Sequence, residues 1–229
     1  MVSRHLNEIR ANPLFAETNE TSFAALIRGA YIQNFPPHTE IITEGEQAGF
    51  LHIIVDGCVE LFSDWNGRET TLSFLRENAT FILAATIKDR PYLMSGRTLV
   101  KSRIIMIPSE DVRAVFEKDA DFAKSIVSEL ASCYRETIKY TKNLKLRSAT
   151  ERLANYVLRL QIDNRGALSF SLPIEKRRIA SFLGMTPENL SRAFANLSSA
   201  GLMVDGQNVT ITDEPALRAL ANSNPLIDG

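Results

Sequence analysis

The stretch Lys176-Arg-Arg-Ile-Ala-Ser-Phe-Leu-Gly-Met-Thr-Pro-Glu-Asn-Leu-Ser-Arg-Ala-Phe194 decides how the C-terminal part of this 229-residue chain folds. The small Ala180 and the following Gly184 predict two helices that cross closely at a turn requiring positive φ. Thr186 is a good helix N-cap and Pro187 suits a first helical position, so the second helix is expected to begin at Pro187. The pattern predicts a helix-turn-helix, with an ordinary pair of packed helices as the alternative.

The residues around this stretch complete a small domain. A helix is expected over residues 149–161, a short strand over 168–172 and a last helix near 215–221. After the motif, residues 203–211 have a hairpin pattern with Asp205-Gly206 at the turn. Helix, short helix, helix and β-hairpin in this order predict a winged helix-turn-helix, a fold that places its second helix in the major groove of DNA.

Charge is unevenly distributed along the chain. The whole sequence has 26 Lys and Arg against 27 Asp and Glu, a net charge of −1, which argues against coating nucleic acid over the whole surface. Residues 1–140 carry 15 basic and 19 acidic side chains, whereas residues 142–204 carry 10 basic and 4 acidic, a balance of +6. A basic module beside an acidic one is typical of a localised phosphate-binding face, with chance clustering on a solvated surface as the alternative.

Upstream of this domain the pattern is that of a β-roll. Between Tyr31 and Pro108, short apolar runs alternate with turn signals, and Gly45, Gly57 and Gly67 punctuate them at intervals of 12 and 10 residues. Helices are expected before Tyr31 and after Pro108. The chain is therefore predicted to be an α+β protein in which a β-roll precedes the winged helix-turn-helix.

A long helix is expected between the two parts. Neither Gly nor Pro interrupts residues 120–146, and roughly 26 helical residues span about 40 Å, more than one β-roll can cover. An apolar seam repeats there at steps of 4 and 3, which predicts a parallel two-fold homodimer, with packing on the chain's own roll as the alternative. The expected interface residues are Ile126, Leu130, Cys133, Thr137, Tyr140 and Leu144. The expected domains are a β-roll sensor domain with flanking helices (1–118), the dimerisation helix (119–147) and the winged helix-turn-helix (148–229).

The second helix of the motif carries side chains that suit base recognition. Glu188, Ser191 and Arg192 share one face near its N-terminus. Arg192 can donate to O6 and N7 of guanine, Glu188 can accept from N4 of the paired cytosine, and Ser191 would meet a neighbouring base. The expected phosphate contacts are Lys176, Arg177, Arg178, Thr186 and Asn189, with Arg147, Arg152, Lys142 and Lys145 as further candidates.

Roll, long helix and winged helix-turn-helix in this order resemble the CRP/FNR family of bacterial transcription regulators. The stretches that carry the resemblance are Phe35-Pro-Pro-His-Thr-Glu-Ile-Ile-Thr-Glu-Gly-Glu46, Leu51-His-Ile-Ile-Val-Asp-Gly-Cys-Val-Glu60 and Ser148-Ala-Thr-Glu-Arg-Leu-Ala-Asn-Tyr156. Glu188-x-x-Ser-Arg192 is similar to the fumarate-and-nitrate-regulator branch of the family. The resemblance implies a cyclic-nucleotide-binding-like jelly roll, an inverted repeat of TTGAT-like half-sites in double-stranded DNA, and RNA polymerase as a partner.

The ligand residues of the family are replaced in this chain. Where its cyclic-nucleotide binders have a Gly-Glu pair for the ribose and an arginine for the phosphate, this chain has Leu83-Ala84 and Met94. A cyclic phosphate would enter an apolar pocket without a matching cation, so the sequence argues against a cyclic nucleotide, with Arg97 as the one substitute nearby. No cysteine precedes Cys58, which argues against the iron-sulfur cluster of the family's anaerobic sensors.

The remaining candidate for an effector site is an apolar pocket in the β-roll. It could hold haem, a hydrophobic small molecule or no ligand. The residues expected to line it are Ile82, Leu83, Ile87, Leu93 and Met94.

The histidines and cysteines predict no metal site. His5, His38 and His52 lack metal-ligand spacing, although His38 or His52 could form a metal or haem site with Cys58 if folding joined them. Cys133 on the seam would face its symmetry mate, which leaves an interchain disulfide open. A redox-, metal- or haem-dependent sensor is the alternative form of the regulator. A cupin-like metalloenzyme is a more remote alternative, because it needs clustered histidines, and we expect no enzyme.

The cysteine content and the distribution of apolar residues also indicate the cellular compartment of the protein. Two cysteines favour a reducing compartment, no apolar core follows the positive charges of the first ten residues, and no stretch approaches about 18 apolar residues. The expected location is therefore the cytoplasm, without a membrane partner.

Overall fold

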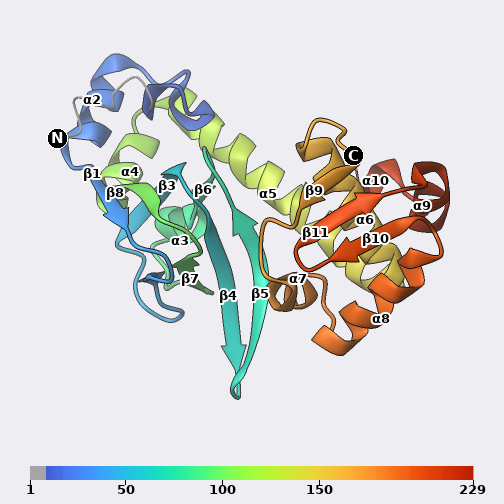
Figure 1. Cartoon of the computed structure of the whole chain (residues 1–229). Helices are drawn as coiled ribbons and strands as arrows, with labels where there is room; N and C mark the ends of the chain where they lie inside the picture. The colour runs from blue at the N-terminus through green and yellow to red at the C-terminus, as the bar shows by residue number, and fades with distance from the viewer. Residues whose placement is uncertain (1–8, 229) are drawn as a thin grey trace. The chain divides into compact units, whose positions relative to one another are not determined.

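The computed structural model describes residues 9–228, which form two compact units that divide after Cys133. The division falls inside one long helix, α5 (Ala120–Leu146), which contributes to both units (Figure 1).

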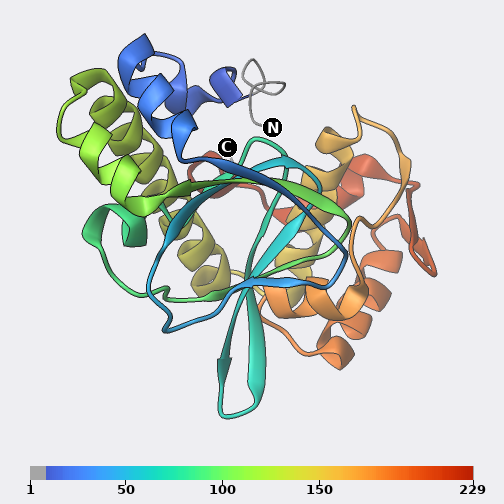
Figure 2. The same cartoon turned by 90° about the vertical axis from the view of Figure 1, so that its left-hand side faces the viewer.

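The first unit is a β-roll of two four-stranded antiparallel sheets (Figure 2). One sheet has the order β1-β8-β3-β6, from Tyr31–Phe35, Ser102–Pro108, Phe50–Asp56 and Thr80–Phe81. The other has the order β2-β7-β4-β5, from Glu40–Ile42, Ser95–Thr98, Val59–Trp65 and Arg68–Leu75. Asn66 and Gly67, both at positive φ, close the β4–β5 hairpin, which extends past the other strands in Figures 1 and 2.

Helices cover one face of the first sheet. Leu51 and Ile53 of β3 pack against the helical side, whereas Ile54 of the same strand faces the core between the sheets, because side chains alternate along a strand. Asp119 is buried before α5 and accepts hydrogen bonds from the backbone N–H of Phe122 and of Asn19. Besides α5, the helices of this unit from residue 13 onward are η2 (Pro13–Phe15), α2 (Glu20–Arg28), α3 (Leu83–Lys88) and α4 (Ser109–Phe116).

The second unit is built on the C-terminal half of α5. Ser148 and Glu151 form a capping box that starts the next helix, α6 (Ala149–Asp163). Helices α7 (Lys176–Phe182) and α8 (Pro187–Ser198) follow, joined by the turn that contains Gly184. The remaining elements are a three-stranded sheet of order β10-β11-β9, from Leu202–Asp205, Asn208–Ile211 and Ser169–Ser171, and the helices α9 (Glu214–Ala221) and α10 (Pro225–Asp228).

The fold class predicted from the sequence is confirmed. An antiparallel β-roll, a long helix and a winged helix-turn-helix follow one another in the expected order. Within residues 9–228, no helix is both long and apolar enough to cross a membrane. The proposed domain limits remain predictions.

Candidate nucleic-acid interface

Helix α8 begins where the sequence predicts. Thr186 has extended backbone angles and its hydroxyl accepts the backbone N–H of Asn189 at 3.3 Å, while Pro187 occupies the first helical position. Gly184 adopts φ +64° in the preceding turn, a conformation that side chains rarely tolerate. Local chemistry alone thus defines the start of α8.

One face of α8 lies in the core and the opposite face is exposed. Leu190, Ala193 and Leu197 are buried at spacings of three and four residues. The three expected base-reading residues, Glu188, Ser191 and Arg192, are all exposed on the other side. The structure therefore brings these residues together on one solvent-facing surface, as the spacing predicts.

The polar groups of this face have distinct hydrogen-bonding states. The pKa of Glu188 is held below its usual value by its own backbone N–H, the Thr186 side chain and the charge of Arg192, so the group is an acceptor at neutral pH. The Ser191 hydroxyl donates to the carbonyl oxygen of Pro187 at 3.0 Å. With its proton in this bond, the Ser191 hydroxyl presents its acceptor lone pairs to DNA.

The basic residues of α7 differ in their exposure to solvent and in their existing contacts. Arg177 is exposed, whereas Lys176 and Arg178 are half-buried. The Lys176 ammonium lies 5.4 Å from the centroid of the Phe194 ring, so part of its charge is already engaged. Arg177 is the most accessible candidate phosphate contact of the three.

Three further basic residues that the sequence offers as phosphate contacts are engaged within the second unit, where Arg147 is buried and Arg152 and Lys142 are half-buried. Arg147 is buried and donates to both carboxylate oxygens of Asp228, at 2.7 and 2.5 Å. Arg152 donates to the carbonyl oxygens of Leu183 and Arg147, at 2.8 and 2.7 Å. Lys142 reaches the carbonyl oxygen of Leu226. Guanidinium groups that satisfy buried carbonyls and a carboxylate are tied to the fold rather than to a ligand.

The expected dimer seam on α5 is largely covered by the chain's own units. Ile126 has no exposed surface, because it lies in the core of the first unit, and Leu130 packs against the same core. In the second unit, Tyr140 stacks on Phe182 with ring centroids 5.6 Å apart. A side chain without exposed surface cannot contact a second chain, so Ile126 is not an interface residue here, and the alternative of packing on the roll holds for this part of α5. Of the six predicted seam residues, only Cys133 and Thr137 are exposed.

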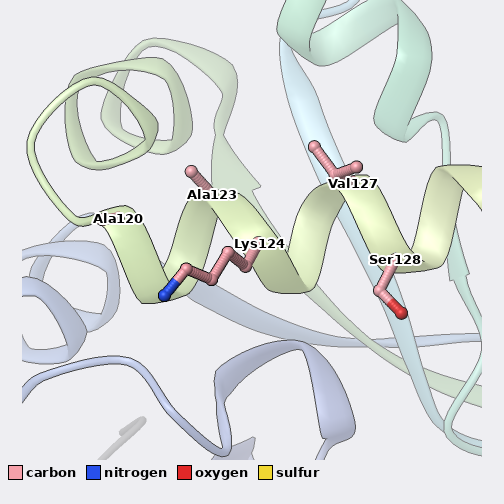
Figure 3. Close-up of a pocket in the computed structure, with 5 residues that line it drawn as sticks. All are labelled: Ala120, Ala123, Lys124, Val127 and Ser128. Carbon is pink, nitrogen blue, oxygen red and sulfur yellow. The ribbon is translucent and has the colours of Figure 1, made fainter.

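A second apolar stripe on α5 is exposed, one position further along the chain. Val127, Tyr134 and Ile138 are 60%, 68% and 44% exposed, and Ala131 is exposed between them. Their spacing of 4, 3 and 4 residues is again that of a coiled-coil seam. A shallow hollow lined by Ala120, Ala123, Lys124, Val127 and Ser128 continues the exposed stripe toward the N-terminus of α5 (Figure 3). The same spacing can be found in the sequence, but the neighbouring seam through Ile126 is the more apolar pattern at its start and is favoured instead.

The residues of the expected effector pocket do not line one cavity. Leu83 and Ile87 pack with the helical core, and Ile82 and Met94 pack with the core between the sheets. Leu93 is 79% exposed. The five residues are therefore divided between two cores and the surface.

Arg97 is not available as a substitute cation for a cyclic phosphate. Its Nε donates to the fully buried carboxylate of Glu60 at 2.8 Å, and its two terminal nitrogens donate to Glu69. The guanidinium also lies over the Phe62 ring, 4.1 Å from its centroid. With the uncharged Met94 packed against the apolar core and Arg97 bound by two carboxylates, these residues do not fit a cyclic nucleotide phosphate.

The histidines and cysteines form no metal centre among residues 9–228. His52 is buried between aromatic rings, 4.9 Å from the centroid of Phe81, and burial lowers its pKa to about 4. Cys58 is buried, which raises the pKa of its thiol. His38 is exposed, and His5 lies outside the described residues.

Comparisons with known proteins match both units. Residues 32–119 match the family model of the cyclic nucleotide-binding domain, and residues 151–220 match that of the Crp-like helix-turn-helix domain. The chain is 23% identical over 219 residues to a CRP-like cAMP-activated global transcriptional regulator of Mycobacterium tuberculosis, covering 93% of this chain and 98% of that protein. It is 22% identical over 186 residues to the transcriptional activator protein anr of Pseudomonas aeruginosa, covering 79% and 76%.

A solved structure shows the same fold. A putative transcriptional regulator of the CRP/FNR family from Eubacterium rectale superposes with a TM-score of 0.76 at 19% identity, covering 92% of this chain and 98% of that one. The roll, the long helix and an exposed polar face on a capped recognition helix define a DNA-binding transcriptional regulator. The chain belongs to the CRP/FNR family. Members of this family are regulators rather than enzymes, so the cupin-like metalloenzyme alternative is excluded.

Proposed function

We propose that the protein is a homodimer that binds an inverted repeat of TTGAT-like half-sites through Glu188, Ser191 and Arg192, and that it acts on RNA polymerase in the cytoplasm. The observation that carries the proposal is the recognition face of α8, where an anionic acceptor and a guanidinium are exposed together. This pair matches the cytosine N4 donor and the guanine O6 and N7 acceptors of one G·C pair.

A second copy of the chain is the partner that fits the exposed stripe of α5. An apolar stripe repeating every three and four residues is covered most completely by an equivalent helix running parallel to it. We therefore assign the dimer interface to Val127, Ala131, Tyr134 and Ile138 in place of the seam predicted from the sequence.

The controlling signal in this proposal is not a cyclic nucleotide. Met94 offers no charge, and Arg97 is already bound by Glu60 and Glu69. The effector, if it enters the roll, has to displace packed apolar side chains such as Leu83, which favours a small apolar ligand over an anion.

The structure supports a route from α5 to the recognition helix. The Tyr140 hydroxyl donates to the carbonyl oxygen of Phe182 at 2.7 Å, at the end of α7. Arg152 joins the carbonyl oxygens of Arg147 and Leu183, so it ties the end of α5 to the start of the turn before α8. A rotation of α5 about its axis is thus expected to move α8 with it.

Binding to duplex DNA tests the proposal. A palindromic duplex with two TTGAT half-sites should be bound as a dimer, and Arg192→Ala should lose about 1 to 3 kcal/mol of discrimination at one G·C pair. Unchanged base preference in that variant would refute the assignment. Cyclic AMP and cyclic GMP should leave the melting temperature unchanged, and a saturable rise with either would refute the assignment of the signal.

A further inference from the structure

Asn189 follows Glu188 on α8 and contacts the other charged reader, Arg192. The guanidinium of Arg192 donates from Nη2 to the side-chain oxygen of Asn189, one helical turn before it. Asn189 itself is fixed by its backbone N–H, which donates to the Thr186 hydroxyl. The acceptor for Arg192 is therefore attached to the capped first turn of the helix.

The neighbouring reader is held by different groups. Glu188 stands four residues before Arg192, a spacing at which acidic and basic side chains pair readily on a helix. The pKa of Glu188 is lowered first by its own backbone N–H and the Thr186 side chain, and less by the charge of Arg192. A direct bidentate pair between the two would occupy two of the guanidinium donors and offset the charge that each group presents to a base edge.

We propose that Asn189 is a positioning residue for base recognition, whose side-chain oxygen holds the Arg192 guanidinium apart from Glu188. This inference rests on the proposed function of Arg192 as a guanine reader. It replaces the sequence expectation that Asn189 contacts a phosphate. A guanidinium has five N–H donors, so one bond to Asn189 leaves a pair of donors for guanine O6 and N7. The contact reduces the side-chain freedom that Arg192 loses on binding.

A positioning residue and a phosphate contact at Asn189 would have different effects on DNA binding. A positioning residue affects the preference for one base pair, whereas a phosphate contact affects all sequences equally and contributes to the salt dependence of binding. The ratio of the affinities for two duplexes that differ only at the G·C pair distinguishes the positioning role from the phosphate contact. Because both affinities are measured on one protein, the ratio is also insensitive to a partly unfolded sample.

The experiment starts from a duplex library with two randomised half-sites, from which the full-length protein selects its best duplex. Arg192→Ala on the same library identifies the G·C pair that Arg192 reads, with an expected loss of preference of roughly tenfold. Affinities are then measured for the selected duplex and for the duplex with that pair changed to A·T, over a series of salt concentrations.

Asn189→Ala should lower the preference for the G·C duplex about three- to tenfold and leave the salt dependence unchanged. Asn189→Asp places a second carboxylate beside Arg192, so by the same reasoning as for Glu188 it should also lower the preference for the G·C duplex, and its added charge weakens binding to both duplexes. Asn196→Ala is the matched control, because this exposed asparagine of α8 contacts Thr150 rather than Arg192.

Two results would overturn the inference in distinguishable ways. Equal losses on both duplexes with Asn189→Ala, together with a weaker salt dependence, would make Asn189 a phosphate contact while the reading by Arg192 stands. An unchanged preference profile with Arg192→Ala would remove the reading assignment itself, and the role of Asn189 with it.

Discussion

Gly184 and Leu144 are packed so closely that a side chain at Gly184 would place its Cβ 2.7 Å from Cδ2 of Leu144. The turn before the recognition helix therefore favours glycine for two reasons: its φ of +64° strains other residues, and an added Cβ would force the end of the Leu144 side chain to shift. The sequence predicts the first reason only.

Gly184→Ala should cost about 2 kcal/mol of unfolding free energy, measured by urea denaturation. Gly166→Ala is the matched control, because Gly166 also has positive φ but has nothing within 4 Å of the added Cβ, so backbone strain of about 1 kcal/mol is its whole cost. Leu144→Ala should partly rescue Gly184→Ala. Equal costs for the two glycine variants would show that the Leu144 contact does not matter.

Engineered cysteines distinguish the two seams of α5. In a Cys133→Ser background, Ile138→Cys should form an interchain disulfide under mild oxidation, because the exposed stripe brings this position close to its symmetry mate. The wild-type protein, with Cys133 outside that stripe, is the internal control and should stay uncrosslinked. Efficient crosslinking through Cys133 on non-reducing gels would favour the seam first predicted from the sequence.

Burial of His52 makes the roll acid-sensitive. The folded pKa of about 4 lies below the ordinary value of 6.5, so the unfolded chain binds more protons between these values. The contribution of neutral His52 to the free energy of unfolding is therefore fully present above pH 6.5. It is lost as the pH falls toward 4, and the total loss is about 3 kcal/mol. His52→Phe should abolish this part of the pH dependence in urea titrations. A parallel decline of variant and parent from pH 6.5 to 4 would contradict the assignment.

The ion pair of Arg147 and Asp228 should matter more than an exposed one. Arg147→Met leaves a partly buried carboxylate unpaired and should cost about 3 kcal/mol of unfolding free energy. Arg218→Met removes a pair with Glu214 in which the Arg218 side chain is 52% exposed, and should cost less than about 0.5 kcal/mol. Similar losses in the two variants would argue against a structural role for Arg147.

Several features of the DNA-binding unit are local and could be predicted. The start of α8 depends on Thr186 and Pro187, and the separation of its buried and exposed faces depends on the spacing of Leu190 from Glu188 and Arg192. These relations act within one or two helical turns, where capping and periodicity decide the structure. The same holds for the Asn66-Gly67 turn, whose positive φ values the residue types favour.

The faces of α5 could not be assigned in this way. Two apolar stripes with the same spacing run along the helix, one through Ile126 and one through Val127, and periodicity cannot tell which of them the chain itself covers. The same limit applies to the basic residues, because Arg147 and Arg177 have equal charge in the sequence and only tertiary contacts bury the first.

The sequence by itself determined the order of the elements, the family and the composition of the recognition face, because these depend on short-range pattern and residue type. The tertiary structure decided which side of α5 is exposed, that Arg97 is bound by Glu60 and Glu69, and how the residues of the expected pocket are divided between two cores. Each of these depends on contacts between residues far apart in the chain, and such contacts are set by packing of the whole domain.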